Sequence, residues 1–455
     1  MIVIFCYFSN QFRINYCFMK NKPISHFGIS KFINQETIGG VLLIFATIVA
    51  LFWANSSYYS SYHYLWYELK AGFTWGDFKL MGSLHHWIND GLMALFFFTV
   101  GLEIKREIIG GELSSVKKAS LPIMAAVGGM VIPAVVYSLV VINKPELMHG
   151  WGVPMATDIA FALGLLAMLG KRVNINLKIF LTALAIADDL GAILVIAIFY
   201  TKAIDFKELL TAAVFMIVLI VANYAGVRRA LFYAVVGFSG VWLSFFFSGV
   251  HATIAGVLIA LTIPARTKID EDTYISKLEA LLRKFRKENP SENPLLTKEQ
   301  ADVVEEIDKV NDEAQTPLQK LEHFMHPITT FLILPVFALA NAGVRIEGNI
   351  FDLMFHPIAI AIILGLILGK FIGISLFSRL MVKFKLATLP EGVSWKQIYG
   401  VALLAGIGFT MSIFISELAF SDEAFRQIAK VGIMAASVIA ALLGMGWLAL
   451  TSKKE

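Results

Sequence analysis

The chain has 455 residues, of which 57% are hydrophobic and only 16% charged, and its mean hydropathy is +0.71. Ordinary globular domains are about 25% charged, so this composition excludes a soluble globular fold and predicts a polytopic membrane protein. The net charge of +4 gives no indication of nucleic-acid binding. Cys6 and Cys17 both lie in the N-terminal leader, so the body of the chain offers no disulfide or thiolate-bound cofactor.

The N-terminal leader does not have the pattern of a signal peptide. Residues 1–18 lack a basic start and a small-residue cleavage site. Met19 begins a basic stretch, typical of a cytoplasmic N-terminus. We interpret residues 1–18 as an upstream extension that is not native and residues 19–36 as the cytoplasmic N-terminus.

Apolar segments long enough to cross a bilayer recur along the chain and predict an all-α protein with about twelve transmembrane helices. Spans one to eight occupy 37–264 and spans nine to twelve occupy 327–450, followed by a cytoplasmic tail at 451–455. The expected spans are 37–54, 87–104, 119–142, 152–170, 177–200, 207–225, 230–247, 250–264, 327–343, 357–380, 397–418 and 428–450.

The loops between these spans differ in charge. Basic residues concentrate in alternate loops, for example Lys117 and Lys118, then Arg228 and Arg229, while the intervening loops are poorer in them. Because cytoplasmic loops carry the excess of lysine and arginine, the pattern predicts that both termini are cytoplasmic.

Two connections are long. Residues 55–86 contain glycine and aspartate between aromatic runs, a pattern compatible with a short β-hairpin on the outer face. Residues 265–326 form a charged cytoplasmic insert, in which apolar spacing on both sides of Pro290 and Pro294 predicts two solvated helices. This insert is interpretable as a tether or as a regulatory platform.

The segment ALAIADDLGAILVIAIF, residues 183–199, places Asp188 and Asp189 in the middle of an apolar span. One aspartate at the centre of a membrane helix costs roughly 2.5–3.5 kcal/mol. Neighbours on a helix point about 100° apart, so both carboxylates can border a water-filled cavity between helices. Such acids indicate handling of ions or protons, although capping of a broken helix is the structural alternative.

Two other spans, the fourth and the eleventh, contain helix breaks. In VPMATDIAFALG, Pro154 interrupts the helix just before Thr157 and Asp158. In LLAGIGFTMSIFI, Gly406 and Gly408 loosen the helix just before Thr410. Interrupted helices in corresponding positions of two halves indicate an inverted-repeat transporter, although glycine pairs are also ordinary packing surfaces.

Lys370 lies alone in the span IILGLILGKFIGISLF and requires a carboxylate partner or the loss of its proton. A lysine and three aspartates at similar depth form a site whose charge has to balance. Exchange follows from this balance, because sodium ions and protons compete for the same carboxylates.

Further titratable residues lie near the expected cytoplasmic ends of two spans. Histidine titrates near neutral pH, so these clusters form a candidate pH sensor, with ordinary interfacial charge as the alternative. His251 stands alone at the start of a span, with a structural or a sensing role. The cluster residues are Glu103, Lys105, Arg106 and Glu107, and Glu322, His323 and His326.

From about residue 35 onward the sequence resembles the NhaA-type sodium/proton antiporters. The resemblance is carried by long motifs, including WINDGLMALFFFTVGLEIKRE, ATDIAFALG, KIFLTALAIADDLGAI, SGVHATIAGV, LEHFMHP, LPVFALANAGV, LGKFIGISLF and GIGFTMSIFI. The N-terminal 18 residues and the long charged insert depart from it.

The resemblance implies roles for individual residues. Asp188 and Asp189 would bind the transported Na⁺ or Li⁺ and the proton, with Asp189 the more direct ligand. Asp158 and Thr157 would offset the facing ends of the broken fourth helix, and Lys370 would pair with Asp188 when sodium is absent. The titratable clusters match positions associated with pH activation, and Asp90 in WIND matches a family acid. The loop 55–86 would mediate a homodimer.

We therefore expect an antiporter of the bacterial inner membrane that exports Na⁺, and Li⁺, in exchange for inward protons, without a cofactor and without enzymatic activity. No phosphate-binding G-x-x-x-x-G-K-[ST] motif occurs in the sequence. A passive cation channel is one alternative. An intramembrane aspartyl protease is another, since Asp158 and Asp189 stand on separate spans and such enzymes share one proton between two acids.

Overall fold

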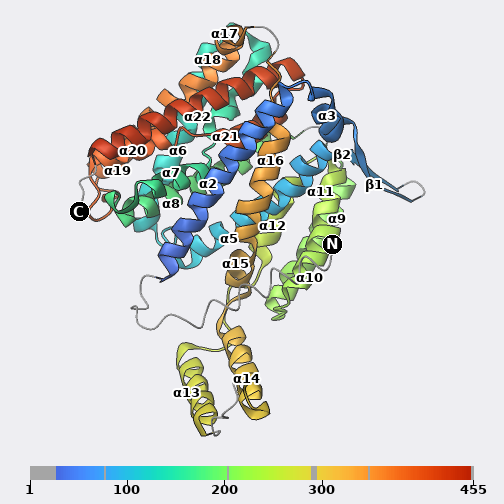
Figure 1. Cartoon of the computed structure of the whole chain (residues 1–455), viewed down its shortest axis with the longest axis vertical. Coiled ribbons are helices and arrows are strands. Elements are labelled where there is room, and N and C mark those ends of the chain that lie inside the picture. Colours follow the sequence, from blue (N-terminus) through green and yellow to red (C-terminus); the bar gives the residue numbers. More distant parts are fainter. Residues whose placement is uncertain (1–26, 76–77, 202–203, 288–294, 347–348, 452–455) are drawn as a thin grey trace.

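The computed structural model describes residues 27–75, 78–201, 204–287, 295–346 and 349–451. The extension expected at 1–18, residues 19–26 of the N-terminal segment expected at 19–36, and residues 452–455 of the expected tail lie outside these ranges. Within them the chain forms one helical bundle with a two-helix insert hanging from one end and a β-hairpin near the other (Figure 1). We call these the insert end and the hairpin end.

All twelve expected spans are helical. In the first half they are α2 (Phe27–Ala54), η3 (Trp87–Leu92) with α5 (Met93–Gly110), α6 (Val116–Val140), η4 (Pro145–Met155) with α7 (Ile159–Met168), α8 (Ile175–Phe199), α9 (Phe206–Tyr224), α10 (Ala230–Val236) with η6 (Gly237–Trp242) and α11 (Leu243–Ser248), and α12 (Ala252–Thr262). In the second half they are α15 (Pro317–Ile328) with η7 (Thr329–Ile333) and α16 (Leu334–Asn341), α18 (Pro357–Leu364) with η8 (Gly365–Gly369) and α19 (Lys370–Lys383), α20 (Trp395–Leu404) with α21 (Phe409–Ala419), and α22 (Glu423–Thr451).

Length and apolar composition support a multi-pass membrane protein. Among the described residues, eight continuous helices are long and apolar enough to cross a membrane, and the two bent pairs raise this number to ten. The remaining two expected spans are the helix that contains α5 and the short α12, which has 11 residues. The expected all-α membrane fold is confirmed.

Both expected helix interruptions are present. The axes of η4 and α7 meet at 45° across residues 156–158, and those of α20 and α21 meet at 47° across residues 405–408. Pro154 lies in the last turn of η4, and Gly408 directly precedes α21. The two broken spans are therefore the fourth and the eleventh, as the sequence predicts.

The shorter elements lie at the two ends of the bundle. At the hairpin end, β1 (Lys70–Trp75) pairs antiparallel with β2 (Phe78–Ser83), with Lys70 opposite Ser83. The expected hairpin is thus confirmed, and its strands project from the side of the bundle (Figure 1). The other short elements are α3 (Tyr59–His63), η2 (Tyr64–Glu68), α4 (Leu84–His86), η5 (Gly170–Arg172) and α17 (Ile350–Met354).

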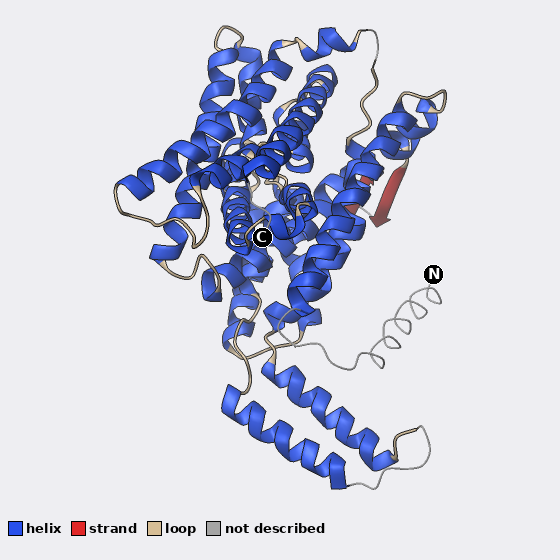
Figure 2. Ribbon diagram, turned by 60° about the vertical axis from the view of Figure 1, so that its left-hand side comes forward, coloured by secondary structure: helices blue, strands red, loops and turns tan. Residues whose placement is uncertain are grey.

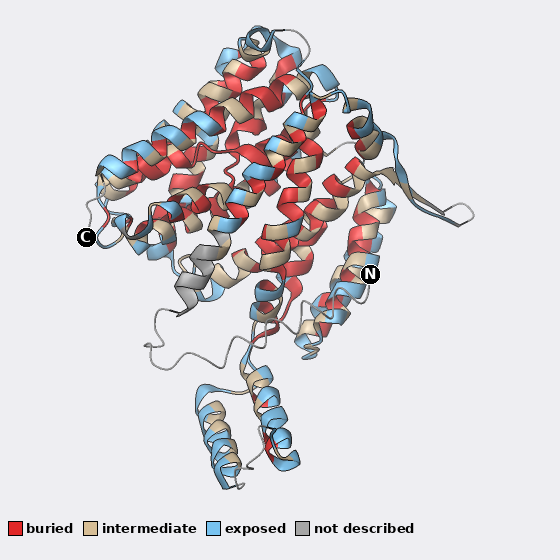
Figure 3. Ribbon diagram, viewed as in Figure 1, coloured by how far each residue is buried: buried red, intermediate tan, exposed pale blue. Residues whose placement is uncertain are grey.

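The insert forms two antiparallel helices, α13 (Glu271–Lys287) and α14 (Lys298–Ala314) (Figure 2). Their surface is mostly exposed, whereas buried residues concentrate inside the bundle (Figure 3). Tyr274 donates to Asn311 between the two helices, and Glu313 accepts from Lys268 and Lys277 at their base. The expectation of two solvated helices is confirmed.

Close packing of α6 against α19 sets the depth of Lys370. A side chain added at Gly373 would lie 2.0 Å from the carbonyl oxygen of Gly128, so the two backbones touch there. Small residues permit this approach in membrane bundles. Next to this contact, a side chain at Gly129 would lie 3.6 Å from Cδ of Lys370, an ordinary contact distance, so the lysine stem packs beside this glycine. The packing therefore directs Lys370 into the interior.

Candidate functional site

The two helix interruptions lie against each other in the middle of the bundle. The backbone N–H of Asp158 donates to the carbonyl of Ile407 over 2.7 Å, and Thr157 Oγ1 donates to the carbonyl of Ala405 over 2.9 Å. Ser412 Oγ donates to the carbonyl of Val153 over 2.8 Å. Each break thus supplies donors to backbone groups that the other break leaves unpaired, which is how non-helical backbone is tolerated at membrane depth.

Asp158 caps two helices with one carboxylate. Its Oδ1 accepts from the backbone N–H of Phe161 at the start of α7 (2.9 Å). Its Oδ2 accepts from the N–H (3.0 Å) and the hydroxyl (2.5 Å) of Thr410 at the start of α21. Helix N-termini carry partial positive charge, so a buried carboxylate at the meeting point of two of them is stabilised.

Lys370 lies on the other side of the helix crossing, the name we use for the point where the two interrupted helices meet. Its Nζ contacts Asp188 Oδ2 and donates to Thr157 Oγ1 over 2.9 Å. Thr157 Oγ1 also lies 2.7 Å from Asp188 Oδ2, so its single proton is shared between this carboxylate and the Ala405 carbonyl. Lys370 and Asp188 are both completely buried. A π-helical turn, Gly365–Gly369, directly precedes the lysine, and such turns are frequent at functional sites.

Asp189 is the acid whose charge this network leaves uncompensated. It is 1% exposed, and its Oδ1, like Oδ1 of Asp188, is buried without a hydrogen-bond partner among the described residues. Thr157, Asp188 and Lys370 therefore form one hydrogen-bonded group, and Asp158 and Thr410 form a second. Asp189 follows Asp188 on α8 and borders the first group. Carboxylate oxygens that lack donors are suitable ligands for a hard cation such as Na⁺.

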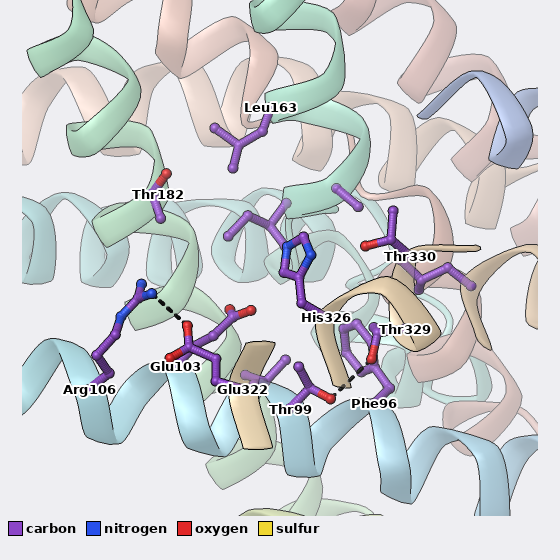
Figure 4. A pocket seen from close by; sticks show the side chains of 14 residues that line it. Phe96, Thr99, Glu103, Arg106, Leu163, Thr182, Glu322, His326, Thr329 and Thr330 are labelled. Atoms are coloured by element: carbon purple, nitrogen blue, oxygen red, sulfur yellow. Dashed lines mark hydrogen bonds and ion pairs between the residues drawn. The ribbon is translucent and has the colours of Figure 1, made fainter. Parts of the chain in front are cut away.

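A cavity of about 70 Å³ leads from the insert end toward this group. Its ionisable lining, which we call the mouth, consists of Glu103, Arg106, Glu322 and His326 (Figure 4). Ile159 and Ala160, which follow Asp158, also line the cavity. The carboxylate of Glu103 is near enough to interact electrostatically with Asp189.

Most of the expected pH-sensing residues gather at the mouth of this cavity. Arg106 donates to Glu322 over 2.5 Å and to Glu107 over 2.9 Å, so it links α5 to α15. His323, in contrast, is exposed and does not line the cavity. His251 lies apart from the cluster, at the end of α12 opposite the insert, where its Nε2 is 2.9 Å from the carbonyl oxygen of Tyr200.

Asp90 also lies away from the crossing. Its Oδ2 is 3.0 Å from Nδ1 of His86 near the hairpin end, and this hydrogen bond raises the pKa of His86.

The sequence did not lead us to expect two groups of buried polar or charged side chains. One consists of threonines along the cavity, and their signal was the polar pair in ITTFLI within an apolar span. The other is a buried cluster at the hairpin end, where Glu417 contacts Lys430 and Arg426. Lys430 lies in an expected span, just as Lys370 does, so the same argument was open. The threonines are Thr99, Thr182, Thr329 and Thr330.

Comparison with known proteins agrees with this geometry. Residues 30–448 match the model of the family described as "Na+/H+ antiporter 1". The chain belongs to this family. It is 49% identical to the Na(+)/H(+) antiporter NhaA of Acidithiobacillus ferrooxidans over 428 residues, which cover 93% of this chain and 98% of that protein.

Other antiporters of the family are similarly close. The Na(+)/H(+) antiporter NhaA 1 of Psychromonas ingrahamii is 47% identical over 415 residues, covering 90% of this chain and 94% of that protein. The protein of the same name from Saccharophagus degradans is also 47% identical, over 94% of this chain and 92% of its own length. The expected resemblance to NhaA-type antiporters is therefore confirmed along nearly the whole chain.

Proposed function

We propose that this protein is a secondary antiporter that exchanges Na⁺ for protons by alternating access around Asp188 and Asp189. The observation that carries the proposal is the pair of buried carboxylate oxygens without partners beside the Lys370–Asp188 ion pair. The names of the relatives support the same substrates, and a transporter of this family is not expected to act as an enzyme.

The charges explain why binding of the two substrates is mutually exclusive. In the structure Lys370 offsets one carboxylate, so the second carries an uncompensated charge inside the membrane region. A sodium ion or a proton can remove this charge. Protons delivered to the acids weaken their hold on Na⁺, and Na⁺ bound to both acids displaces the lysine from Asp188. Each substrate therefore expels the other without a cofactor.

The arrangement does not suit the rival chemistry of an aspartyl protease. That reaction requires two acids that share one proton. Both oxygens of Asp158 already accept hydrogen bonds from the N-terminal ends of α7 and α21. This carboxylate therefore stabilises the two helix ends and does not share a proton with Asp189. A passive channel is distinguished by experiment, because it would carry Na⁺ without moving protons.

The decisive experiment uses everted membrane vesicles from cells that lack other sodium/proton antiporters. A pH-sensitive dye reports proton movement after addition of NaCl, LiCl or KCl. We expect Na⁺-dependent and Li⁺-dependent exchange in the wild type and its loss in Asp188→Asn and Asp189→Asn. Asp352→Asn, at an exposed acid of α17, is the matched control. A well-inserted wild type that moves no protons between pH 6.5 and 9 would refute the proposal.

We further propose that the Arg106 cluster regulates exchange by pH. Arg106 joins α5 to α15 at the cavity mouth, and protonation of Glu322 would release it from α15. Glu322→Gln should shift the pH at which exchange is half-maximal, with little change in the maximal rate. An unshifted pH profile would exclude this role.

The orientation and assembly of the protein follow as proposals from the sequence. The alternating basic loops favour a bacterial inner-membrane protein with both termini in the cytoplasm, so the insert end would face the cytoplasm. The strands β1 and β2 project from the bundle (Figure 1), which suits a contact between two copies. Deletion of 70–82 should abolish dimer formation in cross-linking experiments, and an unchanged dimer would contradict the proposal.

A further inference from the structure

The helix that carries Lys370 has an exposed apolar strip on its outer side. Its side chains recur every four residues through η8 and α19, so they share one face of the helix, and they are between 36% and 48% exposed: Leu368, Ile372, Leu376 and Leu380. At 1.5 Å per residue the strip is roughly 18 Å long, close to half of a hydrocarbon core about 30 Å thick. One acyl chain of a single leaflet therefore fits along it.

The strip ends in basic residues. Arg379 and Lys383 follow on the same face of α19, and both are exposed. From Phe371 to Lys396 the chain has four basic residues and one acid, Glu391. Glu391 lines a cavity between the starts of α6 and α8 that Arg379 and Lys383 do not line. In the part of the chain that the structure describes, neither of these two cations forms an ion pair. The positive charge at the end of the strip is therefore not offset by a carboxylate of the protein.

This end of α19 lies at the same boundary of the bundle as the Arg106 cluster. The loop after α19 contacts the starts of α6 and α8: Ser120 Oγ donates to the carbonyl of Leu386 over 3.2 Å, and Asn176 Nδ2 donates to the carbonyl of Glu391 over 2.8 Å. Since α6 begins shortly after the end of α5 that bears Arg106, the basic residues mark the membrane boundary at the insert end. Basic side chains at such a boundary attract anionic lipids.

Two aromatic rings of α20, which lies beside α19 (Figure 1), hold the guanidinium group of Arg379. Its Cζ is 5.5 Å from the ring centroid of Trp395 and 5.3 Å from that of Tyr399, within the range of about 6 Å for a cation–π contact. The two rings stack on each other, with centroids 6.4 Å apart. No described residue accepts a hydrogen bond from Arg379. Its planar fork of N–H donors, which fits a phosphate group, is therefore held in place and available to a ligand.

We propose that this face of α19 and α20 binds an anionic phospholipid, with the phosphodiester on Arg379 and Lys383 and one acyl chain along the strip from Leu368 to Leu380. A soluble phosphate would use the basic end alone, whereas a lipid also covers the strip. The bound lipid fixes the end of the helix that carries Lys370 at the membrane boundary. The inference requires an inserted protein and does not depend on the exchange of Na⁺ for protons.

The test measures binding of phosphatidylglycerol to the purified full-length protein in detergent, by native mass spectrometry and by the rise in melting temperature. Arg379→Gln removes the charge and the fork, and the apparent Kd should rise about tenfold, equivalent to about 1.4 kcal/mol. Trp395→Leu removes one ring and keeps the charge, so the Kd should rise about threefold, as loss of one exposed cation–π contact predicts. Arg172→Gln, at an exposed arginine after α7, is the control and should leave the Kd unchanged.

Two further ligands show whether an anionic lipid is the occupant. Phosphatidylcholine, which has no net charge, should bind about fivefold more weakly than phosphatidylglycerol, as the loss of one ionic contact predicts. Glycerol phosphate, which has no acyl chain, should not raise the melting temperature at the same concentration. Equal binding of the two lipids, full stabilisation by glycerol phosphate, or an equal loss in Arg172→Gln would overturn the inference. If Arg379→Gln aggregates, Arg379→Lys takes its place: it keeps the charge but lacks the fork, and an unchanged Kd in this variant would also overturn the inference.

Discussion

Two buried lysine–carboxylate pairs lie in different parts of the bundle and differ in their surroundings. Lys370 and Asp188 meet at the helix crossing with both side chains fully buried. Lys430 and Glu417 meet near the hairpin end over 2.6 Å, with both side chains 6% exposed. The same chemistry at similar burial therefore occurs twice in one molecule, at the candidate site and away from it.

The balance of charge separates the two pairs. Glu417 is also 3.1 Å from Arg426, and the ring of His85 is 3.9 Å away, so two permanent cations surround one carboxylate. Asp188 has one cation, and its neighbour Asp189 adds a second negative charge. An excess of negative charge creates a site for a cation or a proton, whereas an excess of positive charge does not. A buried ion pair by itself therefore does not identify a transport site.

The Glu417 cluster instead joins elements. Lys430 and Arg426 belong to α22, Glu417 to α21 and His85 to α4, and His85 Nε2 is 3.0 Å from Asn341 Oδ1 at the end of α16. A buried pair that loses one partner is costly, by about 3–5 kcal/mol, because the other charge stays uncompensated. We interpret this cluster as a structural connection at the hairpin end.

The largest expected effect concerns transport. Asp189→Asn should lower the exchange rate by about 100-fold or more, equivalent to about 2.7 kcal/mol, because it removes the uncompensated carboxylate. Glu417→Gln should keep the exchange rate per folded molecule within about threefold of the wild type. This corresponds to a change of less than about 1 kcal/mol in the activation barrier. Dye dequenching in vesicles, normalised to the amount of folded protein, measures both. Equal losses in the two variants would remove the proposed difference between the pairs.

The next effect concerns stability and has the opposite order. Glu417→Gln should destabilise the protein by about 3 kcal/mol, because Lys430 and Arg426 lose their counter-charge. Asp188→Asn should cost less, because Asp189 is available as a new partner for Lys370. Melting temperatures in detergent, followed by size-exclusion chromatography, compare the two. The double variant Glu417→Leu/Lys430→Met should recover part of the loss, because only Arg426 then lacks its counter-charge. A larger loss in Asp188→Asn than in Glu417→Gln would contradict this interpretation.

A smaller effect is expected at Asp158, an acid that is offset by hydrogen bonds rather than by a lysine. Thr410→Val removes the hydroxyl donor and leaves the N–H of residue 410 in place, so a loss of about 1 kcal/mol of stability follows. Ser437→Ala, which removes the 3.2 Å acceptor for the N–H of Phe409 at the same helix start, should cost a similar amount. Melting curves of both variants test this, and no change in either would show that the caps are dispensable.

The smallest effect is expected where a carboxylate and two lysines meet in water. In the insert, hydrogen bonds from Lys268 and Lys277 lower the pKa of Glu313. A carboxylate whose pKa is lowered by folding stabilises the folded protein at any pH above its pKa in the unfolded chain. This stabilisation disappears as the pH falls through its pKa in the folded protein. Glu313→Gln should therefore leave the melting temperature unchanged from pH 6 to pH 9, because exposed pairs contribute little. A marked loss in this range would show that the insert is anchored more strongly than its exposure indicates.

The sequence predicted the positions of the spans and the chemistry of the candidate site with considerable detail. Apolar runs locate membrane helices because the bilayer imposes a length and excludes charge. Pro154 and the glycines at 406 and 408 marked both interruptions because proline and glycine weaken helices, although α6 continues through Pro122 and Pro133. Asp188, Asp189 and Lys370 stood out because each is rare in an apolar span. All of these signals are local, and each can be read from a few neighbouring residues.

Partners across the bundle could not be derived from such local signals. Thr410 lies 252 residues from Asp158, and Lys370 lies 182 residues from Asp188, so only the packing of α6, α19 and the two breaks decides that they meet. The same holds for Glu417, whose three neighbours from α22 and α4 make it a connection and not a site. The sequence by itself determined which residues are costly in a membrane. The tertiary structure decided which of those charges are compensated, because compensation depends on distances between helices.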